Sequence, residues 1–237
     1  MVQVPPAEAF QRSLPGKSVR EVRRHGKYLT LRLEPEGALV VHLKMTGSLL
    51  LRAPGAPPNP YTRAVLYLDP PLELRFCDRR KLGRLWLVPD EVEVTGKLGI
   101  DCLDPAFSSD VLASLLGRHG APIKAVLTDQ HVLAGLGNMY ADEALFRAGV
   151  HPLTPARDAV ERADRLYRAI ADVLAEAIEN KGTTFSDYLD ANGEKGRMQY
   201  KLKVAHRGGQ PCPSCRTPIE RLVLRNRGTY FCPRCQR

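Results

Sequence analysis

The chain has 237 residues, of which 43% are hydrophobic and 26% charged, a composition that excludes an intrinsically disordered chain and is enough for one or two globular domains. No apolar run approaches the length needed to cross a bilayer, and no apolar leader follows a basic start, so we expect neither a membrane partner nor secretion. The net charge of +9 favours a polyanionic partner such as nucleic acid.

The basic residues are clustered. Between residues 196 and 237 ten lysines and arginines face the single acid Glu220, and between residues 17 and 32 six face only Glu21. A third cluster occupies residues 79–84 and contains no acid. A solvated basic face would spread its charge more evenly, so three separated clusters predict a groove lined with positive charge from several sides.

The first hundred residues are predicted to be mostly β-strand. A short helix is expected at Ala7–Ser13, and the Pro-rich loop at 53–60 excludes a central strand there. Alternating apolar residues and turn signals predict strands over residues 18–33, followed by a turn at 35–37, and over 38–45, 48–52, 63–69, 72–78 and 83–88. This pattern predicts a β-sandwich or a barrel.

After Asp101 the apolar period becomes helical. Helices are predicted after a Ser108-Ser109 cap, over 121–128 and over 138–148. Thr154-Pro155 is expected to open a long helix, as a cap followed by proline at the first helical position, with an apolar face from Val160 to Ile178 and an end at Gly182. The polar segment 190–197 is expected to be an exposed, mobile loop.

Four of the six cysteines form two CxxC pairs near the carboxyl end, Cys212 with Cys215 and Cys232 with Cys235. This spacing is typical of a tetrahedral site for one structural zinc ion, with two disulfides or a reduced, metal-free loop as the alternatives. Between the pairs, RLVL and GTYF predict two strands joined by a turn at 225–228. We therefore expect a zinc-clamped β-hairpin with arginines at its tip. The remaining Cys77 and Cys102 are expected to be buried apolar residues.

A glycine-rich turn precedes the helix predicted from Asn138. Gly135 and Gly137 in LAGLGNMYADE would expose backbone N–H groups at a helix N-terminus, where an anion such as a DNA phosphate is favoured. The alternative is a tight interhelical turn in which glycine is needed for steric reasons.

Taken together, these motifs resemble the formamidopyrimidine-DNA glycosylase family. The matching stretches, in chain order, are GKYL, HLKMTG, DRRKLG, IKAVLTDQ, GLGNMYADEALF, GTTFSDYLDANGEKG, QPCPSC and RGTYFC. The resemblance covers essentially the whole chain. It implies an α+β fold of two domains: an N-terminal β-sandwich and a C-terminal helix-two-turn-helix bundle with a four-cysteine zinc β-hairpin. We expect the segments to be 1–103, 104–195 and 196–237.

The resemblance implies base excision repair in the bacterial cytosol or nucleoid. Such enzymes flip an oxidised purine such as 8-oxoguanine or a formamidopyrimidine out of double-stranded DNA, expel it by attack of an amine on the sugar, and nick the strand as AP lyases through a Schiff base. The implied partner is duplex DNA containing oxidised bases or abasic sites, bound by a monomer in the cleft between the two domains.

The resemblance also assigns site residues. The basic loop residue Lys81 is included among the DNA-binding residues, and the segment 190–199 matches the loop that closes over the flipped base. Lys27 and His42 match phosphate contacts, Met45, Arg80 and Leu82 match residues that fill the void left by the flipped base, Lys124 matches a lysine near the lesion pocket, Asn138 and Tyr140 match backbone contacts, and Arg227 matches the finger arginine. Leu82 stands where the family usually has phenylalanine. Ordinary structural or surface roles are the alternatives for these residues.

The start of the sequence departs from the family. The family begins Pro-Glu-Leu-Pro-Glu-Val-Glu, with the proline amine as nucleophile, whereas MVQVPPAEAF resembles the stretch just before the GKYL strand. We therefore expect the gene to encode a further strand and helix upstream that carry the nucleophile. The alternatives are a non-catalytic relative that binds damaged DNA, and an enzyme that uses another amine, from Lys27, Lys124 or Met1.

Two other classes compete with this interpretation. The endonuclease VIII-like branch of the family attacks oxidised pyrimidines, whereas Met45, Arg80 and the form GNMYADE favour the purine branch. A zinc-ribbon module that binds nucleic acid without lesion preference would leave the β domain unexplained.

Overall fold

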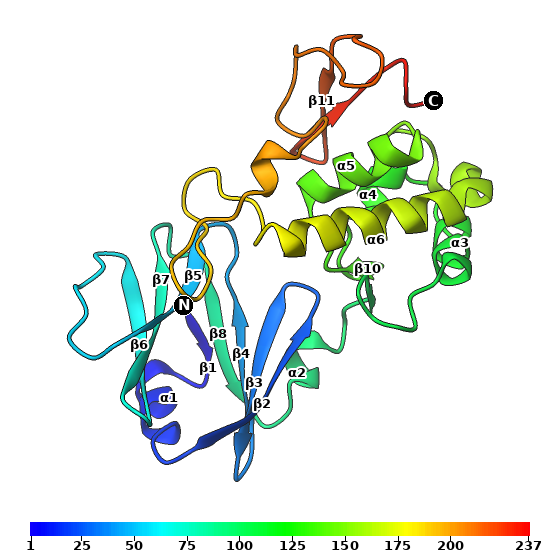
Figure 1. Ribbon diagram of the computed structural model, residues 1–237. Helices are drawn as coiled ribbons and strands as arrows, with labels where there is room; N and C mark the ends of the chain where they lie inside the picture. The colour runs from blue at the N-terminus through cyan, green and yellow to red at the C-terminus, as the bar shows by residue number, and fades with distance from the viewer. The chain divides into compact units, whose positions relative to one another are not determined.

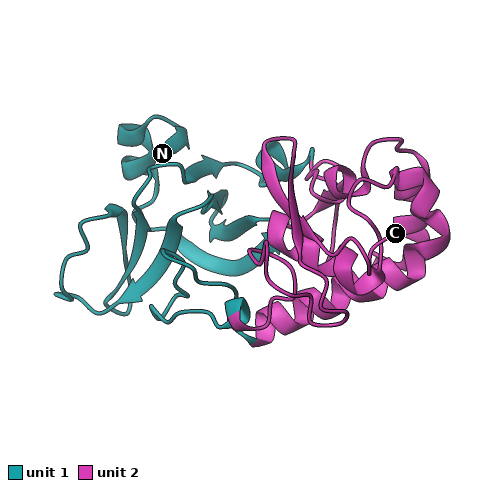
Figure 2. Cartoon of the chain, turned by 90° about the horizontal axis from the view of Figure 1, so that it is seen from above, with its two compact units in different colours: residues 1–97, 180–199 teal, residues 98–179, 200–237 magenta.

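The computed structural model describes residues 1–237 and divides into two compact units (Figures 1 and 2). Unit 1 comprises residues 1–97 and 180–199, and unit 2 comprises residues 98–179 and 200–237. None of the helices combines the length and the apolar character that crossing a membrane requires. The mixed α+β class expected from the sequence is confirmed.

Unit 1 is a sandwich of two sheets. The five-stranded sheet has the order β1-β8-β4-β3-β2, and the three-stranded sheet has the order β5-β7-β6. The strands are β1 (Val2–Val4), β2 (Ser18–His25), β3 (Tyr28–Glu34), β4 (Ala38–His42), β5 (Gly47–Arg52), β6 (Thr62–Leu68), β7 (Leu72–Asp78) and β8 (Arg84–Val88), with helices α1 (Ala7–Ser13) and α2 (Val92–Thr95) beside them. Every strand predicted from the alternation is present.

The core of unit 1 lies between its two sheets. Leu39 and Leu85 from the five-stranded sheet pack in one cluster with Phe76 from the three-stranded sheet, and Phe10 of α1 joins them. The alternation of apolar residues along each strand produces this arrangement, because every second side chain points to the same face of a sheet. Cys77 is buried, as expected.

Unit 2 is built on helices. They are α3 (Ser109–Gly117), α4 (Ile123–Leu127), α5 (Asn138–Ala148), the 3-10 helix η1 (Ala156–Arg162) and α6 (Ala163–Glu179). Two short parallel strands, β9 (Ile100–Asp101) and β10 (Leu133–Ala134), pair beside them. The Ser108 hydroxyl accepts a hydrogen bond from the backbone N–H of Val111, which confirms the predicted cap of α3.

The long helix begins differently from the prediction. Residues 156–162 form η1, and the regular α6 starts only at Ala163. Pro155 is itself the residue before η1, Thr154 provides no capping hydrogen bond, and the Pro155 carbonyl accepts from the Asp158 N–H in a 3-10 turn. The helix also ends at Glu179, before Gly182, and Ile178 is exposed. Propensity rules locate this helix well but not its first turn, since 3-10 turns are common at helix ends.

The compact units follow other boundaries than the three segments expected from the sequence. Residues 180–199 lie with the β-sandwich because their backbone hydrogen-bonds to its edge, where the Leu51 N–H donates to the Ala191 carbonyl. The 3-10 turn η2 (Met198–Tyr200) follows, and the zinc hairpin then lies with the helices of unit 2. Two strands, β11 (Glu220–Leu224) and β12 (Arg227–Phe231), form the predicted hairpin.

Candidate nucleic-acid interface and zinc centre

Strand ends place two of the expected phosphate contacts at one edge of unit 1. Lys27 lies in the two-residue turn between β2 and β3, where His25 pairs with Tyr28. His42 ends β4 opposite Tyr28 on one side and Arg84 on the other. Lys27 is exposed and His42 is half-buried. The five-stranded sheet therefore brings Lys27, His42 and Arg84 to the same edge, although they are far apart in the sequence.

Local contacts fix the chemical state of His42. Its ring packs edge-on against Tyr28, with centroids 4.6 Å apart. The Lys44 N–H donates to Nδ1 at 2.9 Å, so Nδ1 is unprotonated and the neutral ring carries its proton on Nε2. Burial lowers the pKa of His42 to about 4, and the charges of Lys44 and Lys27 act in the same direction. At neutral pH, His42 is an uncharged donor rather than a cation.

Two loops at this edge carry the three residues expected to fill a void in DNA. Residues 43–46 connect β4 to β5 and carry Met45, while residues 79–83 connect β7 to β8 and carry Arg80 and Leu82. The Met45 side chain is 72% exposed, which is unusual for a large apolar residue. Arg80 Nη1 lies 3.6 Å from Met45 Sδ, so the two loops present their side chains together.

The expected lesion loop docks on the same unit. Arg79 forms an ion pair with Asp187 at 2.9 Å, and the Arg52 guanidinium donates to the carbonyls of Ala191 and Asn192. Lys181 pairs with Glu194 across the base of the loop. Most side chains between residues 190 and 197 are exposed, but Gly196 is buried. The loop therefore has an anchored base and an exposed tip.

The zinc centre lies in unit 2, at the base of the hairpin. The Sγ atoms of the four cysteines lie within 4.8 Å of one another, at 3.9 Å for Cys212–Cys235 and 3.4 Å for Cys215–Cys232. Four ligands at about 2.3 Å around a tetrahedral zinc ion would stand about 3.8 Å apart, so the cluster fits one zinc ion. None of the four forms a disulfide. Cys212 and Cys232 are buried with Ile219, which encloses the site.

The hairpin tip is a tight two-residue turn. Leu224 pairs with Arg227, and Arg225 and Asn226 between them both have positive φ angles, 46° and 60°. This geometry is the type I′ turn that matches the twist of a β-hairpin. The predicted turn at 225–228 is thus confirmed in position but is shorter, with Arg227 as the first residue of β12. Arg227 is exposed.

Lys124 is enclosed between two helices and the hairpin. Its side chain is only 2% exposed, and its Nζ lies 2.7 Å from Asp142 Oδ1 on α5. The same Nζ donates to Thr229 Oγ1 at 2.8 Å and to the Gly228 carbonyl at 3.1 Å, both on β12. Lys124 therefore joins α4 to α5 and to the hairpin, and its contact with a lesion stays a prediction.

Burial shifts both members of this pair toward their neutral forms. It raises the pKa of Asp142 to about 7, although the Lys124 charge acts in the opposite direction. It also lowers the pKa of Lys124 despite the attraction of Asp142. Further hydrogen bonds hold each partner in place: Lys124 donates to β12, and the Tyr230 N–H donates to the second Asp142 oxygen at 3.2 Å.

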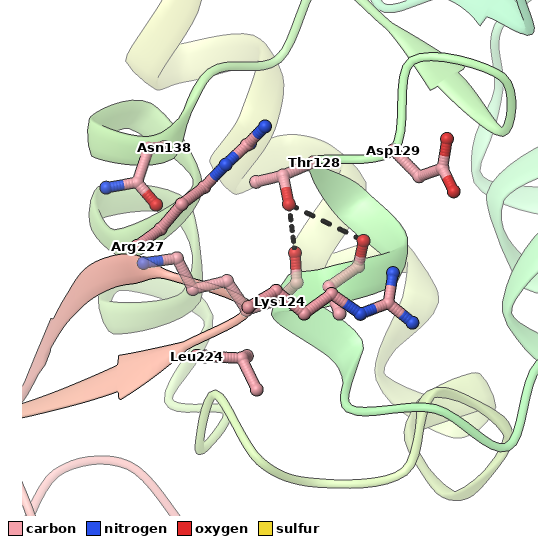
Figure 3. Close-up of a pocket in the computed structure, with 8 residues that line it drawn as sticks. Lys124, Thr128, Asp129, Asn138, Leu224 and Arg227 are labelled. Atoms are coloured by element: carbon pink, nitrogen blue, oxygen red, sulfur yellow. Dashed lines mark hydrogen bonds between the residues drawn. The ribbon is translucent and has the colours of Figure 1, made fainter.

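A small cavity lies between the hairpin tip and the helices (Figure 3). Its volume is about 130 Å³, which is room for several waters or a small anion, since a water occupies about 30 Å³. Lys124 from α4, Asn138 from α5 and Arg227 from β12 line it (Figure 3). The Asn138 side-chain amide donates to the Gly228 carbonyl at 2.8 Å, so Asn138 also holds the hairpin. Tyr140 packs partly against the helical core.

Three buried acids that organise these surfaces were missed from the sequence. Asp142 holds Lys124 and β12, and Glu143 accepts hydrogen bonds from the backbone N–H groups of residues 203–205, which lead to the hairpin. Asp78 is fully buried where β7 ends. Two sequence features could have identified them as buried acids: Asp78 ends an apolar strand, and Asp142 and Glu143 are adjacent in a helix that is otherwise largely apolar.

Comparisons with known proteins decide the family. Three family models match: the formamidopyrimidine-DNA glycosylase N-terminal domain over residues 1–85, the formamidopyrimidine-DNA glycosylase H2TH domain over residues 98–188, and the zinc finger found in FPG and IleRS over residues 209–237. A formamidopyrimidine-DNA glycosylase of Pelotomaculum thermopropionicum is 41% identical over 247 aligned positions, which cover 100% of this chain and 88% of that protein.

The chain belongs to the formamidopyrimidine-DNA glycosylase family.

Other relatives agree with this assignment. The Herpetosiphon aurantiacus formamidopyrimidine-DNA glycosylase is 44% identical, covering 97% of this chain and 85% of the relative. Among solved structures, the MutM (Fpg) protein of Thermus thermophilus is 44% identical with a TM-score of 0.84, covering 93% of this chain and 84% of that one. The Lactococcus lactis Fpg in complex with DNA containing an abasic site is 29% identical with a TM-score of 0.88, covering 97% and 86%.

Membership of this glycosylase family confirms several expectations. Its members are DNA glycosylases of DNA repair with a zinc finger, and the four cysteines form the site of one structural zinc ion. Neither the endonuclease VIII-like alternative nor the non-catalytic one is favoured. The zinc-ribbon alternative does not account for the N-terminal match over residues 1–85.

Proposed function

We propose that this glycosylase excises oxidised purines, 8-oxoguanine and formamidopyrimidines, from double-stranded DNA as a monomer and then nicks the strand as an AP lyase. The relatives bear the name formamidopyrimidine-DNA glycosylase, and Lactococcus lactis homologues are described in complex with abasic-site DNA and with Fapy-dG DNA. The observation that carries the proposal is the meeting of Met45 and Arg80 at one edge of the sandwich.

An exposed apolar side chain beside a guanidinium suits a base that has lost its partner. Flipping a nucleotide out of the stack costs a few kcal/mol, and a protein recovers part of this cost by filling the void. Met45 provides unbranched apolar surface for the gap, and Arg80 provides donors that hydrogen-bond the acceptors of the orphaned base. Leu82, half-buried beside them, is the smaller wedge in place of the family's phenylalanine.

Phosphate contacts position the duplex for this step. In unit 1 we assign them to Lys27, as a charge, and to His42, whose neutral Nε2–H donates a hydrogen bond. Lys81 in the second loop adds a positive charge. In unit 2, Arg227 and Asn138, at the N-terminus of α5, line the small cavity, and we assign a further backbone contact to Tyr140 on the same helix. These groups favour a phosphate oxygen over a neutral ligand.

The proposed chemistry needs a nucleophilic amine. Its nitrogen bonds to the sugar C1′ while the glycosidic C–N bond breaks, and the base leaves with the electron pair and takes up a proton; loss of the ring oxygen from C1′ then gives the Schiff base, from which elimination breaks the strand. We assign the attack to an N-terminal proline amine of the family type, which residues 1–237 do not contain. The enclosed amine of Lys124 supports the fold of the site, and the exposed Lys27 supports phosphate binding.

Base release tests the proposal directly. A duplex with a single 8-oxoguanine is incubated with the protein joined to a family-type amino-terminal segment that begins Pro-Glu-Leu-Pro-Glu, and free 8-oxoguanine is measured alongside strand nicking. Release of the oxidised purine, without release of an oxidised pyrimidine from a matched duplex, is the expected result. Equal release of both bases, or of neither, contradicts the proposed substrate class.

A further inference from the structure

We infer that Asp78 is a positioning residue that locks the two void-filling loops into one arrangement and so controls their insertion into damaged DNA. The inference rests on the proposed function of Met45, Arg80 and Leu82, and it adds a residue that contacts neither DNA nor the reacting atoms. Its basis is the set of hydrogen bonds around one buried carboxylate.

Asp78 sits where the two loops cross between the sheets. The first loop runs from the end of β4 to the start of β5, and the second from the end of β7 to the start of β8. Gly47, which opens β5, pairs directly with Asp78, which closes β7. The Asp78 side chain is 0% exposed, so its carboxylate is enclosed where both loops leave the three-stranded sheet.

The Asp78 carboxylate accepts hydrogen bonds from both loops. Its Oδ1 accepts from the Thr46 hydroxyl at 2.5 Å, next to Met45 in the first loop. The same oxygen accepts from the Arg80 N–H at 3.1 Å, and Oδ2 accepts from the Gly83 N–H at 2.7 Å in the second loop. Thr46 Oγ1 also accepts from the Arg80 N–H at 3.3 Å, which closes a small ring of hydrogen bonds between the loops.

The carboxylate holds these donors as an anion. Burial alone would raise the pKa of Asp78, but hydrogen bonds from the Thr46 hydroxyl and from three backbone N–H groups hold it below its usual value. Hydrogen bonds to a charged acceptor are stronger than neutral ones. An asparagine at this position would turn an NH2 group toward donors that already point inward, and would leave at least one of them unpaired.

The loops need such a lock because their backbones are unfavourable. Lys44 and Lys81, one in each loop, have φ angles of 55° and 58°, a region that non-glycine residues seldom adopt. Gly47 and Gly83 follow, and a Cβ at either would come within 2.4 Å of Leu43 or Phe76. Conformations of this kind persist only where surrounding contacts determine them, and Asp78 makes the contacts that tie one loop to the other.

The assay reports insertion rather than binding alone. A duplex carries a tetrahydrofuran abasic-site analogue with the fluorescent base 2-aminopurine opposite it. Stopped-flow measurement of the 2-aminopurine fluorescence follows the unstacking of that base when the loops insert. Asp78→Asn is expected to slow or reduce the fluorescence change about tenfold or more, as loss of a charged hydrogen bond implies. Affinity for undamaged duplex and its salt dependence, which depend on the phosphate contacts and keep all their charges in this variant, are expected to stay within about twofold.

Matched variants separate positioning from general damage to the fold. Asp90→Ala removes a hydrogen bond that an exposed loop carboxylate accepts from the Val92 N–H beyond the other end of β8, and is expected to behave like the native protein. Thr46→Val removes the hydroxyl that bridges the loops and is expected to share the Asp78→Asn defect, whereas Thr46→Ser keeps the hydroxyl and the native kinetics. If Asp78→Asn does not fold, as judged by the fluorescence of Trp86, the Thr46 pair decides.

The outcomes distinguish the inference from the proposed function. Native insertion kinetics in both Asp78→Asn and Thr46→Val overturn the positioning role while leaving lesion recognition intact. Equal defects in Asp90→Ala also overturn it, because any lost loop hydrogen bond would then suffice. A native protein that shows no fluorescence change with the abasic analogue fails the proposed function itself.

Discussion

The buried pair of Lys124 and Asp142 offers the sharpest test of how the zinc hairpin is held on the helices. Both side chains are almost completely enclosed, and the ammonium contacts the carboxylate at 2.7 Å while also donating to Thr229 and Gly228 on β12. Removing one partner leaves the other charge buried without compensation, which typically costs about 3–5 kcal/mol. We therefore expect Asp142→Leu and Lys124→Met each to destabilise unit 2 by about this amount.

The double variant provides the decisive comparison. With both charges gone, no uncompensated charge remains, and only the hydrogen bonds to β12 are lost, at about 1–3 kcal/mol for each buried group left unpaired. The double variant should therefore lose at least about 2 kcal/mol less than the sum of the two single variants. Asp164→Asn, which breaks an exposed pair with Arg168 on α6, serves as the control and should cause no measurable change.

Two probes report the two units separately. Zinc release during urea unfolding, followed with a chromogenic chelator, reports the hairpin of unit 2. The single tryptophan, Trp86, lies on β8 and reports unit 1 as an internal control. If the two single losses add to the double loss within about 0.5 kcal/mol, Lys124 and Asp142 do not act as a pair.

Three further predictions concern pH, metal and DNA. Burial lowers the pKa of His42 to about 4 in the folded protein, so as the pH falls the imidazole is protonated first in the unfolded state, and the contribution of His42 to folding stability is present above about pH 6.5 and is lost as the pH drops toward 4. His42→Asn should therefore flatten the pH dependence of the unfolding free energy between pH 6.5 and 4, followed by Trp86 fluorescence. An unchanged pH dependence would contradict the lowered pKa. Zinc chelation should unfold the hairpin and weaken DNA binding, whereas undiminished affinity would exclude the hairpin as a DNA contact. Arg227→Ala should weaken binding to all duplexes and lower the salt slope by about one unit, and an unchanged slope would count against a phosphate contact.

Local patterns were enough to predict the elements and the zinc ligands. The CxxC spacing brings Cys212 next to Cys215 and Cys232 next to Cys235, because each pair is held by its own short turn. The two strands between the pairs form a hairpin in the register of its two-residue turn, and this brings the two pairs together. Alternation of apolar residues located the strands of the sandwich, since one face of each sheet is buried. These features depend on contacts close in sequence or on a strong period.

Features that depend on distant contacts could not be predicted in this way. Nothing in the neighbourhood of Lys124 shows that Asp142 and Thr229 will enclose it, because the partners meet only after the hairpin docks. The docking of residues 180–199 on the sandwich likewise depends on a backbone bond between Leu51 and Ala191. Asp78 belongs to the DRRKLG motif, but its role follows only from the hydrogen bonds that it accepts from two loops far apart in the sequence.

Covalent trapping tests most directly the proposal that this glycosylase excises oxidised purines through a Schiff base. Borohydride is added to the protein and an 8-oxoguanine duplex, using residues 1–237 alone and the same residues joined to the amino-terminal segment of a formamidopyrimidine-DNA glycosylase relative. We expect a protein–DNA adduct with the extended protein, and none when the lesion is replaced by guanine. Absence of an adduct with both proteins, or equal trapping on undamaged DNA, would contradict it.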